Sequence, residues 1–199
     1  MPMLVSTPFQ EYVMAMDRVL RRLRTVTAAL DAAGVRYAVI GGNAVATWVA
    51  ERNPAATRTT KDVDLLVEYD DVERVVAAVD SLGFRRDDDR RSVILLDPED
   101  PDRKSGVHLV WAGRRVRPSS LHPAPSLDEA VRSREGYLVL SLPALLRMKL
   151  TAFRDIDRVH IRDMLGVGLI DAAVEATLPA DLLARQREIQ ATIDPDDDL

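Results

Sequence analysis

Two aspartates separated by a single residue are the groups in this chain best suited to chemistry. Asp62 and Asp64 alternate with apolar residues at the start of a run, residues 62–68, that predicts a strand. Side chains two apart on a strand point to the same face, roughly 7 Å apart at the backbone. Aspartate is disfavoured in strands, so the pair needs a reason. Either both carboxylates bind a divalent cation, or both lie at an exposed strand end and only interact with water.

A pair of glycines precedes these aspartates. Gly41-Gly42 follow a β-branched run, Val35–Ile40, that predicts a buried strand, and they precede a helix predicted over residues 44–51 with Asn43 as its cap. Glycine lets a backbone approach a ligand closely, and the free N–H groups at a helix start suit a phosphate. The turn is therefore either a phosphate-binding element or only a tight connection.

The elements that must position these residues follow one another in a simple order. Apolar periodicity predicts a long helix over residues 9–32, a hairpin of strands at residues 92–97 and 107–111, and a short strand at residues 137–140. Further helices are predicted at residues 71–82, 144–153, 158–165 and 181–193. The pattern indicates an α+β core at residues 1–140, a C-terminal helical part at residues 141–193 and an acidic tail at residues 194–199.

The composition excludes several classes of protein. The chain is 47% hydrophobic and 30% charged and has no cysteine, so it is globular and has neither disulfides nor thiolate zinc sites. It lacks an apolar run of membrane-spanning length and a secretory signal, which predicts a cytoplasmic protein without a membrane partner. The net charge of −5 argues against a uniformly basic nucleic-acid binder. Arginine clusters near residues 18–24, 85–91 and 114–117 either contact phosphate or form a solvated face.

The two motifs together carry a family resemblance. The order strand, Gly41-Gly42, helix, then Arg58-Thr59-Thr60-Lys61-Asp62-Val63-Asp64 resembles the nucleotidyltransferase superfamily over residues 37–67. More narrowly, it resembles the AbiEii-like branch of small bacterial nucleotidyltransferases, the toxins of type IV toxin–antitoxin pairs. The resemblance implies a mixed β-sheet core flanked by helices, with Asp62 and Asp64 as catalytic metal ligands. It also implies that Gly41, Gly42, Arg58 and Thr60 bind the nucleotide.

A second block supports the narrower resemblance. Leu146-Arg147-Met148-Lys149-Leu150-Thr151-Ala152 and the later pair Arg162-Asp163 resemble the Lys-Leu-x-Ala helix and the Arg-Asp pair of the family. By that likeness Lys149 contacts the nucleotide phosphates, and Asp163 is the acid of the later catalytic motif. Taken without the likeness, Lys149 reads as an ordinary surface lysine.

One position departs from the superfamily pattern, which places a third carboxylate on a later strand. The corresponding strand, residues 106–111, carries His108 instead of an acid. A neutral histidine can bind a metal or accept a proton, so His108 either takes over one of these tasks or is a half-buried strand residue in a site without a base. Asp97, at the end of the neighbouring strand, is the other residue that could substitute.

These observations predict transfer of a nucleoside monophosphate from a nucleoside triphosphate to an acceptor hydroxyl, with Mg²⁺ or Mn²⁺ bound by Asp62 and Asp64. By the resemblance, the acceptor is RNA, including transfer RNA ends, or a protein hydroxyl; a small antibiotic is a further alternative. A cognate antitoxin protein is the expected macromolecular partner. The alternative is a catalytically degenerate module that binds a nucleotide or a partner without reacting.

Overall fold

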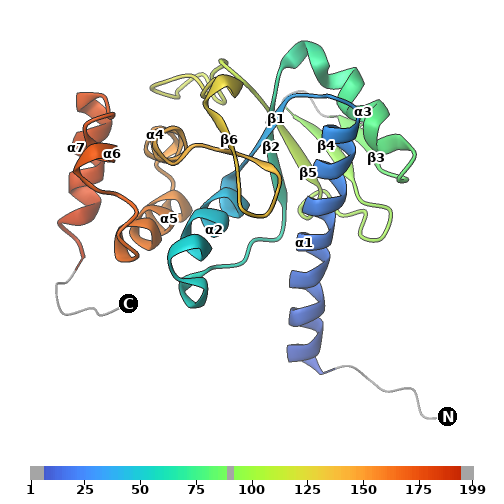
Figure 1. The fold of residues 1–199 in the computed structure, drawn as a ribbon, viewed down its shortest axis with the longest axis horizontal. Helices are drawn as coiled ribbons and strands as arrows, with labels where there is room; N and C mark the ends of the chain where they lie inside the picture. Colours follow the sequence, from blue (N-terminus) through green and yellow to red (C-terminus); the bar gives the residue numbers. More distant parts are fainter. Residues whose placement is uncertain (1–6, 89–91, 194–199) are drawn as a thin grey trace.

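The computed structural model describes residues 7–88 and 92–193 (Figure 1). The acidic tail and the arginines at positions 90 and 91 lie outside the described residues. The centre of the molecule is a mixed sheet of seven strands in the order β3-β4-β5-β2-β1-β7-β6. The strands are β1 (Tyr37–Ile40), β2 (Val63–Val67), β3 (Arg85–Asp88), β4 (Val93–Leu96), β5 (Val107–Trp111), β6 (Ala130–Arg132) and β7 (Leu138–Leu140).

The predicted long helix is α1 (Pro8–Ala32). Thr7 caps it with a capping box, because its hydroxyl accepts from the backbone N–H of Gln10 while the Gln10 side chain accepts from the backbone N–H of Thr7. The C-terminal half of α1 buries residues such as Leu23 and Val26 against the sheet, whereas its first turns extend past the rest of the molecule (Figure 1). Of the described residues, none belongs to a helix long and apolar enough to cross a membrane.

The connection from β1 to the next helix differs from the prediction. The helix α2 (Gly41–Arg52) begins at Gly41 itself, with Ile40 as the preceding residue and no side-chain cap. The prediction of Asn43 as a cap was wrong, because Asn43 lies inside the first turn, where its side chain is buried. Its amide Nδ2 donates instead to the carbonyl oxygen of Asp62 at 2.7 Å, so this residue ties α2 to the start of β2.

The remaining helices surround the strands as the sequence indicated, with small shifts at their ends. They are α3 (Val72–Asp80), α4 (Leu142–Ala152), α5 (Asp155–Gly166) and α7 (Ala180–Gln190), with the one-turn helix α6 (Ala172–Glu175) between the last two. Three short 3-10 helices lie at Pro54–Ala56, Tyr69–Asp71 and Leu127–Glu129. Helices α4 to α7 gather at one side of the sheet beyond α2 (Figure 1). The α+β class is confirmed, while the division at residue 140 stays a prediction.

Strand pairing decides which side chains meet. β1 and β2 are antiparallel with Ile40 opposite Asp64, and β2 and β5 are parallel with Asp64 opposite His108. The predicted hairpin is confirmed, since β4 and β5 are antiparallel. The edge strands β3 and β6 were not predicted; β3 is Arg85-Arg86-Asp87-Asp88, a charged sequence with no strand pattern. The C-terminal end of β1 and the N-terminal ends of β2 and β5 therefore lie side by side, at the same end of these three central strands.

Candidate active site

Two carboxylates lie at this end of the central strands. Asp62 immediately precedes β2 and Asp64 is its second residue, and both side chains are partly buried. Burial, and then the negative charge of Asp62, raise the pKa of Asp64 from 3.8 to about 6. Three nearby basic side chains, those of His108, Lys149 and Arg154, oppose this rise. These five side chains therefore lie close enough to act on one another, although they come from β2, β5 and the α4–α5 junction.

The first glycine of the pair makes room for a carboxylate. A Cβ atom on Gly41 would lie 2.0 Å from the Asp64 Oδ2 atom, and Gly41 has a φ of +68°, in the left-handed region. A Cβ on Gly42 would lie 2.9 Å from the Cβ of Thr60. Both glycines are thus required by the close approach of α2 to the residues that carry the acids. Their predicted role toward phosphate stays a prediction.

The segment before β2 is held by polar contacts. The Thr60 hydroxyl donates to Asp62 Oδ1 at 2.6 Å. The Arg58 Nε atom donates to both carboxylate oxygens of Asp163, at 2.9 and 2.7 Å. The Asp163 side chain is only 7% exposed and that of Arg58 is 58% exposed. The structure therefore brings the predicted residues Arg58 and Asp163 together as an ion pair, and leaves most of the arginine open to solvent at the site.

Lys149 is not a surface lysine. Its residue exposure is 5%, and its ammonium lies 3.2 Å from the Asp157 carboxylate. Burial lowers the pKa of Lys149, while the charges of Asp157 and Asp64 oppose that fall. Lys149 is therefore a buried residue of α4 whose charge acts on Asp64, and its predicted contact with nucleotide phosphates stays a prediction. Asp157 and Arg154 were not singled out from the sequence; their spacing of three residues at the start of α5 was the available signal.

His108 lies opposite Asp64 on the neighbouring strand β5, and its ring is fixed by the backbone. Its Nε2 atom lies 2.8 Å from the carbonyl oxygen of Arg103. A carbonyl only accepts, so the ring donates from Nε2, and in the neutral form Nδ1 carries the lone pair. The other candidate, Asp97, is bound by Arg22 of α1 at 2.7 Å and is only 8% exposed. Asp97 is therefore committed to a structural ion pair.

The donor set fits a magnesium-type cation that shares its coordination with a substrate. Within residues 7–88 and 92–193, no group of three or more His, Cys, Asp or Glu side chains could hold a metal by itself. Two neighbouring carboxylates remain, and the pKa of Asp64 is raised by burial and then by the charge of Asp62. Mg²⁺ is commonly held by one or two carboxylates together with substrate phosphates and water, so Asp62 and Asp64 suffice for such an ion.

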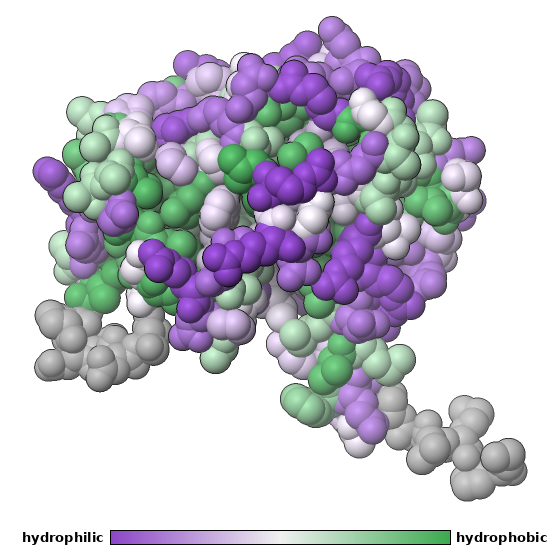
Figure 2. Space-filling view, viewed as in Figure 1, coloured by the Kyte–Doolittle hydropathy of each residue, from purple (hydrophilic) through white to green (hydrophobic). Residues whose placement is uncertain are grey.

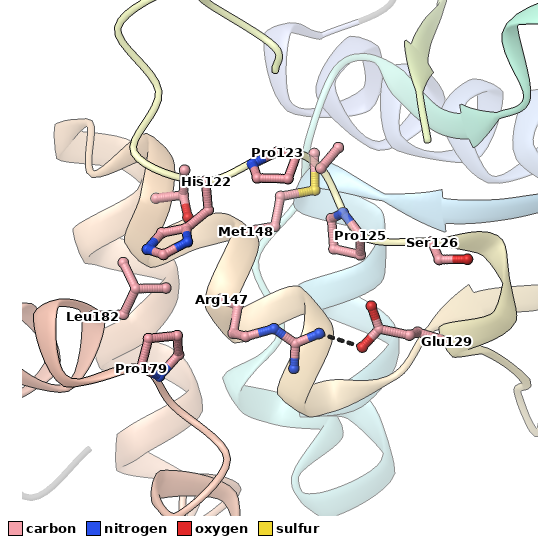
Figure 3. Close-up of a pocket in the computed structure, with 11 residues that line it drawn as sticks. His122, Pro123, Pro125, Ser126, Glu129, Arg147, Met148, Pro179 and Leu182 are labelled. Atoms are coloured by element: carbon pink, nitrogen blue, oxygen red, sulfur yellow. Dashed lines mark hydrogen bonds and ion pairs between the residues drawn. The ribbon is translucent and has the colours of Figure 1, made fainter. Parts of the chain in front are cut away.

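A separate cavity lies on the other side of α4. Its volume is about 260 Å³, and Figure 3 shows that Arg147 reaches across it to the carboxylate of Glu129. His122 borders the same cavity and pairs with Asp181 at 2.8 Å, although the sequence gave it no evident partner. None of the predicted site residues lines this cavity, so it is distinct from the carboxylate site.

Comparison with known proteins agrees with this geometry. Residues 7–133 match the family described as "Uncharacterised nucleotidyltransferase". This chain therefore belongs to that nucleotidyltransferase family, and the match spans α1, the glycine turn and both strands that carry Asp64 and His108. No curated protein matches the chain.

One solved structure shares the fold of this chain at low sequence identity. ANT(2″)-Ia in complex with adenylyl-2″-tobramycin is 15% identical, with a TM-score of 0.50 over 88% of this chain and 98% of that chain. The solution structure of the antibiotic-resistance factor ANT(2″)-Ia has a TM-score of 0.48 at 15% identity, covering 89% of this chain and 85% of that one. The Megavirus polyadenylate synthase has a TM-score of 0.43 at 10% identity, covering 98% of this chain but only 40% of the synthase.

Proposed function

We propose that this nucleotidyltransferase moves a nucleoside monophosphate from a nucleoside triphosphate to an acceptor hydroxyl in a metal-dependent reaction. One observation carries the proposal. Asp62 and Asp64, at the start of β2, lie close to Lys149 and Arg154 from the α4–α5 junction, and Gly41 packs against Asp64. Acids that hold a divalent cation and cations that face phosphates are the groups that nucleotidyl transfer requires.

Asp62 and Asp64 are the residues that would hold Mg²⁺ or Mn²⁺. A bound cation supplies neutralisation of triphosphate charge and lowers the pKa of an attacking hydroxyl. Thr60 fixes one oxygen of Asp62, and Asn43 fixes its backbone carbonyl. The Asp62 carboxylate is thus oriented before any ligand arrives, which reduces the reorganisation needed during the reaction.

The phosphate-binding role falls to the cations around the acids. Lys149 points at the site from its buried position, and the Arg58 guanidinium is oriented by Asp163 but largely exposed. Gly41 and Gly42 form the start of α2, where the free backbone N–H groups of a helix N-terminus suit a phosphate. Together these groups would bind the triphosphate and stabilise the charge that develops on the pyrophosphate leaving group.

His108 would receive the proton of the acceptor hydroxyl. With Nε2–H donated to the Arg103 carbonyl, the lone pair of the neutral ring is on Nδ1. A neutral imidazole accepts a proton near physiological pH, so the histidine can serve as the general base that the third carboxylate would otherwise provide. Asp163 acts in this scheme by orienting Arg58, not by contacting the reacting atoms.

The acceptor proposed first is RNA, including transfer RNA ends, with a protein hydroxyl and a small antibiotic as the other acceptors to be assayed. The likeness to the AbiEii-like branch favours RNA and a toxin role. The ANT(2″)-Ia neighbour was solved with adenylyl-2″-tobramycin, which is why aminoglycosides belong in the assay. A cytoplasmic location and a cognate antitoxin belong to the same proposal.

The test uses each α-labelled nucleoside triphosphate with Mg²⁺ or Mn²⁺ and total RNA, purified protein or tobramycin as the acceptor. We expect label on one acceptor class with the wild type, and a loss of at least about 1,000-fold in the Asp62→Asn/Asp64→Asn double variant. The double variant should remain folded, as judged by its circular dichroism. Activity retained in the double variant would rule out the proposal.

A second candidate, a module that binds a nucleotide or a partner without reacting, is favoured by two observations. The third acid is replaced by His108, and the first turns of α1 expose apolar side chains, with Phe9 73% and Tyr12 51% exposed (Figure 2). The Tyr12 hydroxyl lies 3.3 Å from that of Thr59, beside the segment leading to β2. This candidate predicts that a triphosphate raises the melting temperature without being consumed.

A further inference from the structure

A buried aspartate joins the two cations that face the carboxylate site. Asp157, in the first turn of α5, has 0% exposure. Its Oδ2 atom accepts from the Arg154 Nε at 2.7 Å and from the Arg154 backbone N–H at 3.2 Å. Its Oδ1 atom accepts from the Arg154 Nη2 at 3.2 Å and lies 3.2 Å from the Lys149 ammonium. One carboxylate therefore holds both the arginine and the lysine.

The charges of this cluster do not cancel. Lys149 and Arg154 bring two positive charges and Asp157 brings one negative charge, so one positive charge is left over. Burial would raise the pKa of Asp157, but the hydrogen bond from Arg154 and the charge of Lys149 outweigh it and hold that pKa below 3.8. The neighbouring His160 adds no charge at neutral pH, because burial and then the charge of Lys149 lower its pKa to about 4.

Arg154 is accessible, and it lies close enough to the acids for the charges to interact. Its side chain is 53% exposed, and its charge acts on Asp64 and Asp62 as well as on Asp157. Nε and Nη2 are used by Asp157, while Nη1 has no hydrogen bond within the described part of the chain. A guanidinium with one side fixed by a buried carboxylate presents its other side in a defined direction, which suits an oxygen of a phosphate.

The backbone before Arg154 shows that this orientation is built into the fold. Phe153, which ends α4, has a φ of +51°, the one non-glycine residue with positive φ in the described ranges 7–88 and 92–193. This left-handed residue turns the chain between α4 and α5 within a few residues. The Phe153 ring packs against two guanidinium groups: the Cζ atoms of Arg158 and Arg185 lie 3.9 and 4.6 Å from the ring centroid. Such conformations persist only where the surroundings enforce them.

We propose that Arg154 binds the β- and γ-phosphates of the nucleoside triphosphate, and that Asp157 is the positioning residue that aims Arg154 and Lys149 at them. This assignment rests on the proposed function, since it names a further contact to the same triphosphate. The ligand class is a nucleoside triphosphate, as distinct from a nucleoside monophosphate, because the surplus positive charge lies opposite the acids that would hold the metal.

The decisive experiment is calorimetric binding in the presence of Mg²⁺. Nonhydrolysable α,β-methylene analogues of ATP, GTP, CTP and UTP are titrated into the wild type. The analogue that binds most tightly and the corresponding nucleoside monophosphate are then titrated into each variant. We expect Arg154→Gln to weaken the triphosphate analogue roughly 10- to 100-fold and to leave the monophosphate within about twofold. Arg162→Gln is the matched control, because Arg162 lies on α5, the helix that Arg154 immediately precedes, but bonds Thr192.

The outcomes separate the two proposals. If the wild type binds no triphosphate analogue, both the proposed function and this assignment fail. Three outcomes with a wild type that binds the triphosphate analogue would overturn the assignment to the β- and γ-phosphates while the proposed function stands. Arg154→Gln could bind the analogue as tightly as the wild type, or lose affinity equally for the analogue and the monophosphate. Its affinity could also change no more than that of Arg162→Gln.

The role of Asp157 is tested by pH. Asp157→Asn removes the charge that opposes the fall in the pKa of Lys149, so that pKa should fall further. Triphosphate binding by Asp157→Asn should therefore be lost at a lower pH than in the wild type as the pH is raised from 7 to 10. An unchanged alkaline limit in a folded variant would remove the positioning role. If Asp157→Asn does not fold, the Arg154→Gln comparison still decides the phosphate contact.

Discussion

At the start of β2, Asp62 and Asp64 are like charges held on one face of a strand, whereas at the α4–α5 junction Lys149 and Arg154 share a buried counterion, Asp157. The acidic half of the site is therefore unbalanced in the protein alone, and the pKa of Asp64 rises to about 6 because of burial and then of Asp62. In the cationic half, Asp157 keeps its pKa low through its contacts with Arg154 and Lys149.

The difference indicates which half needs a ligand. A cation relieves repulsion between two carboxylates, so under the proposed function the acidic half is the part that a metal would complete. In the cationic half, the contacts of Asp157 with Lys149 and Arg154 already hold the side chains together. What remains for a ligand there is one uncompensated positive charge. A site built in this way trades stability of the free protein for affinity toward a metal and a triphosphate. The following predictions test this contrast, beginning with the largest expected effect on stability.

Replacing Gly41 by alanine should destabilise the acidic half most. The new Cβ would lie 2.0 Å from Asp64 Oδ2, and the φ of +68° adds strain for any L side chain. We expect a loss of about 3–4 kcal/mol in the free energy of unfolding measured in urea. Gly113→Ala is the control, because Gly113 has a φ of +67° and no atom within 4 Å of an added Cβ. A loss in Gly41→Ala no larger than in the control would contradict the close contact.

Replacing Asp64 by asparagine should stabilise the metal-free protein. The folded-state pKa of about 6 lies above the ordinary 3.8, so the ionised form is disfavoured by folding. The titration of Asp64 by itself therefore lowers the free energy of unfolding as the pH rises from about 4 to 6, and the loss persists above that range. We expect Asp64→Asn to gain about 2 kcal/mol at pH 7.5 in the presence of a chelator.

The matched control for this gain is Asp70→Asn, at an exposed aspartate outside the site. Asp70→Asn should change the free energy of unfolding by no more than about 0.5 kcal/mol. If Asp64→Asn gains no stability above pH 6, or gains as little as Asp70→Asn, the acids are not in electrostatic conflict.

Replacing His160 by glutamine should make the free energy of unfolding depend less on pH below pH 6.5. The pKa of this histidine is lowered from 6.5 to about 4 by burial and then by Lys149, so it is neutral when folded and becomes protonated when unfolded. The titration of His160 by itself therefore lowers the free energy of unfolding as the pH falls from 6.5 toward 4. Measured in the Asp64→Asn background, which removes the opposing titration, His160→Gln should lessen the loss between pH 6.5 and 5 by about 1 kcal/mol. An unchanged slope would show that Lys149 and its surroundings do not depress this histidine.

Much of the acidic half was predictable because its parts are close in the chain. The apolar alternation around Asp62 and Asp64 indicated a strand, and the β-branched run before Gly41 indicated the strand that ends at the turn. Asn43 was assigned wrongly for a physical reason. Ser, Thr, Asp and Asn favour the cap position because they bond nearby N–H groups, but here the amide meets a distant carbonyl, that of Asp62.

The cationic half was predictable only in part. Lys149 and Asp163 came from a resemblance to a known family, and the pairing of Asp163 with Arg58 across 105 positions of the chain has no local sequence signal. Asp157 reads in the sequence as one more charged residue on a helix. Only the packing of α4 against α5 and the turn at Phe153 show that it is fully buried between two cations.

The sequence by itself therefore determined the order of the longer helices and of the central strands, the glycine turn and the pair of acids, because these depend on side-chain periodicity and on neighbours a few residues apart. The tertiary structure decided the strand register that sets His108 beside Asp64, the commitment of Asp97 to Arg22, and the burial of Lys149 with Asp157. Those features depend on which side chains exclude water from one another, and that is fixed only when distant segments pack together.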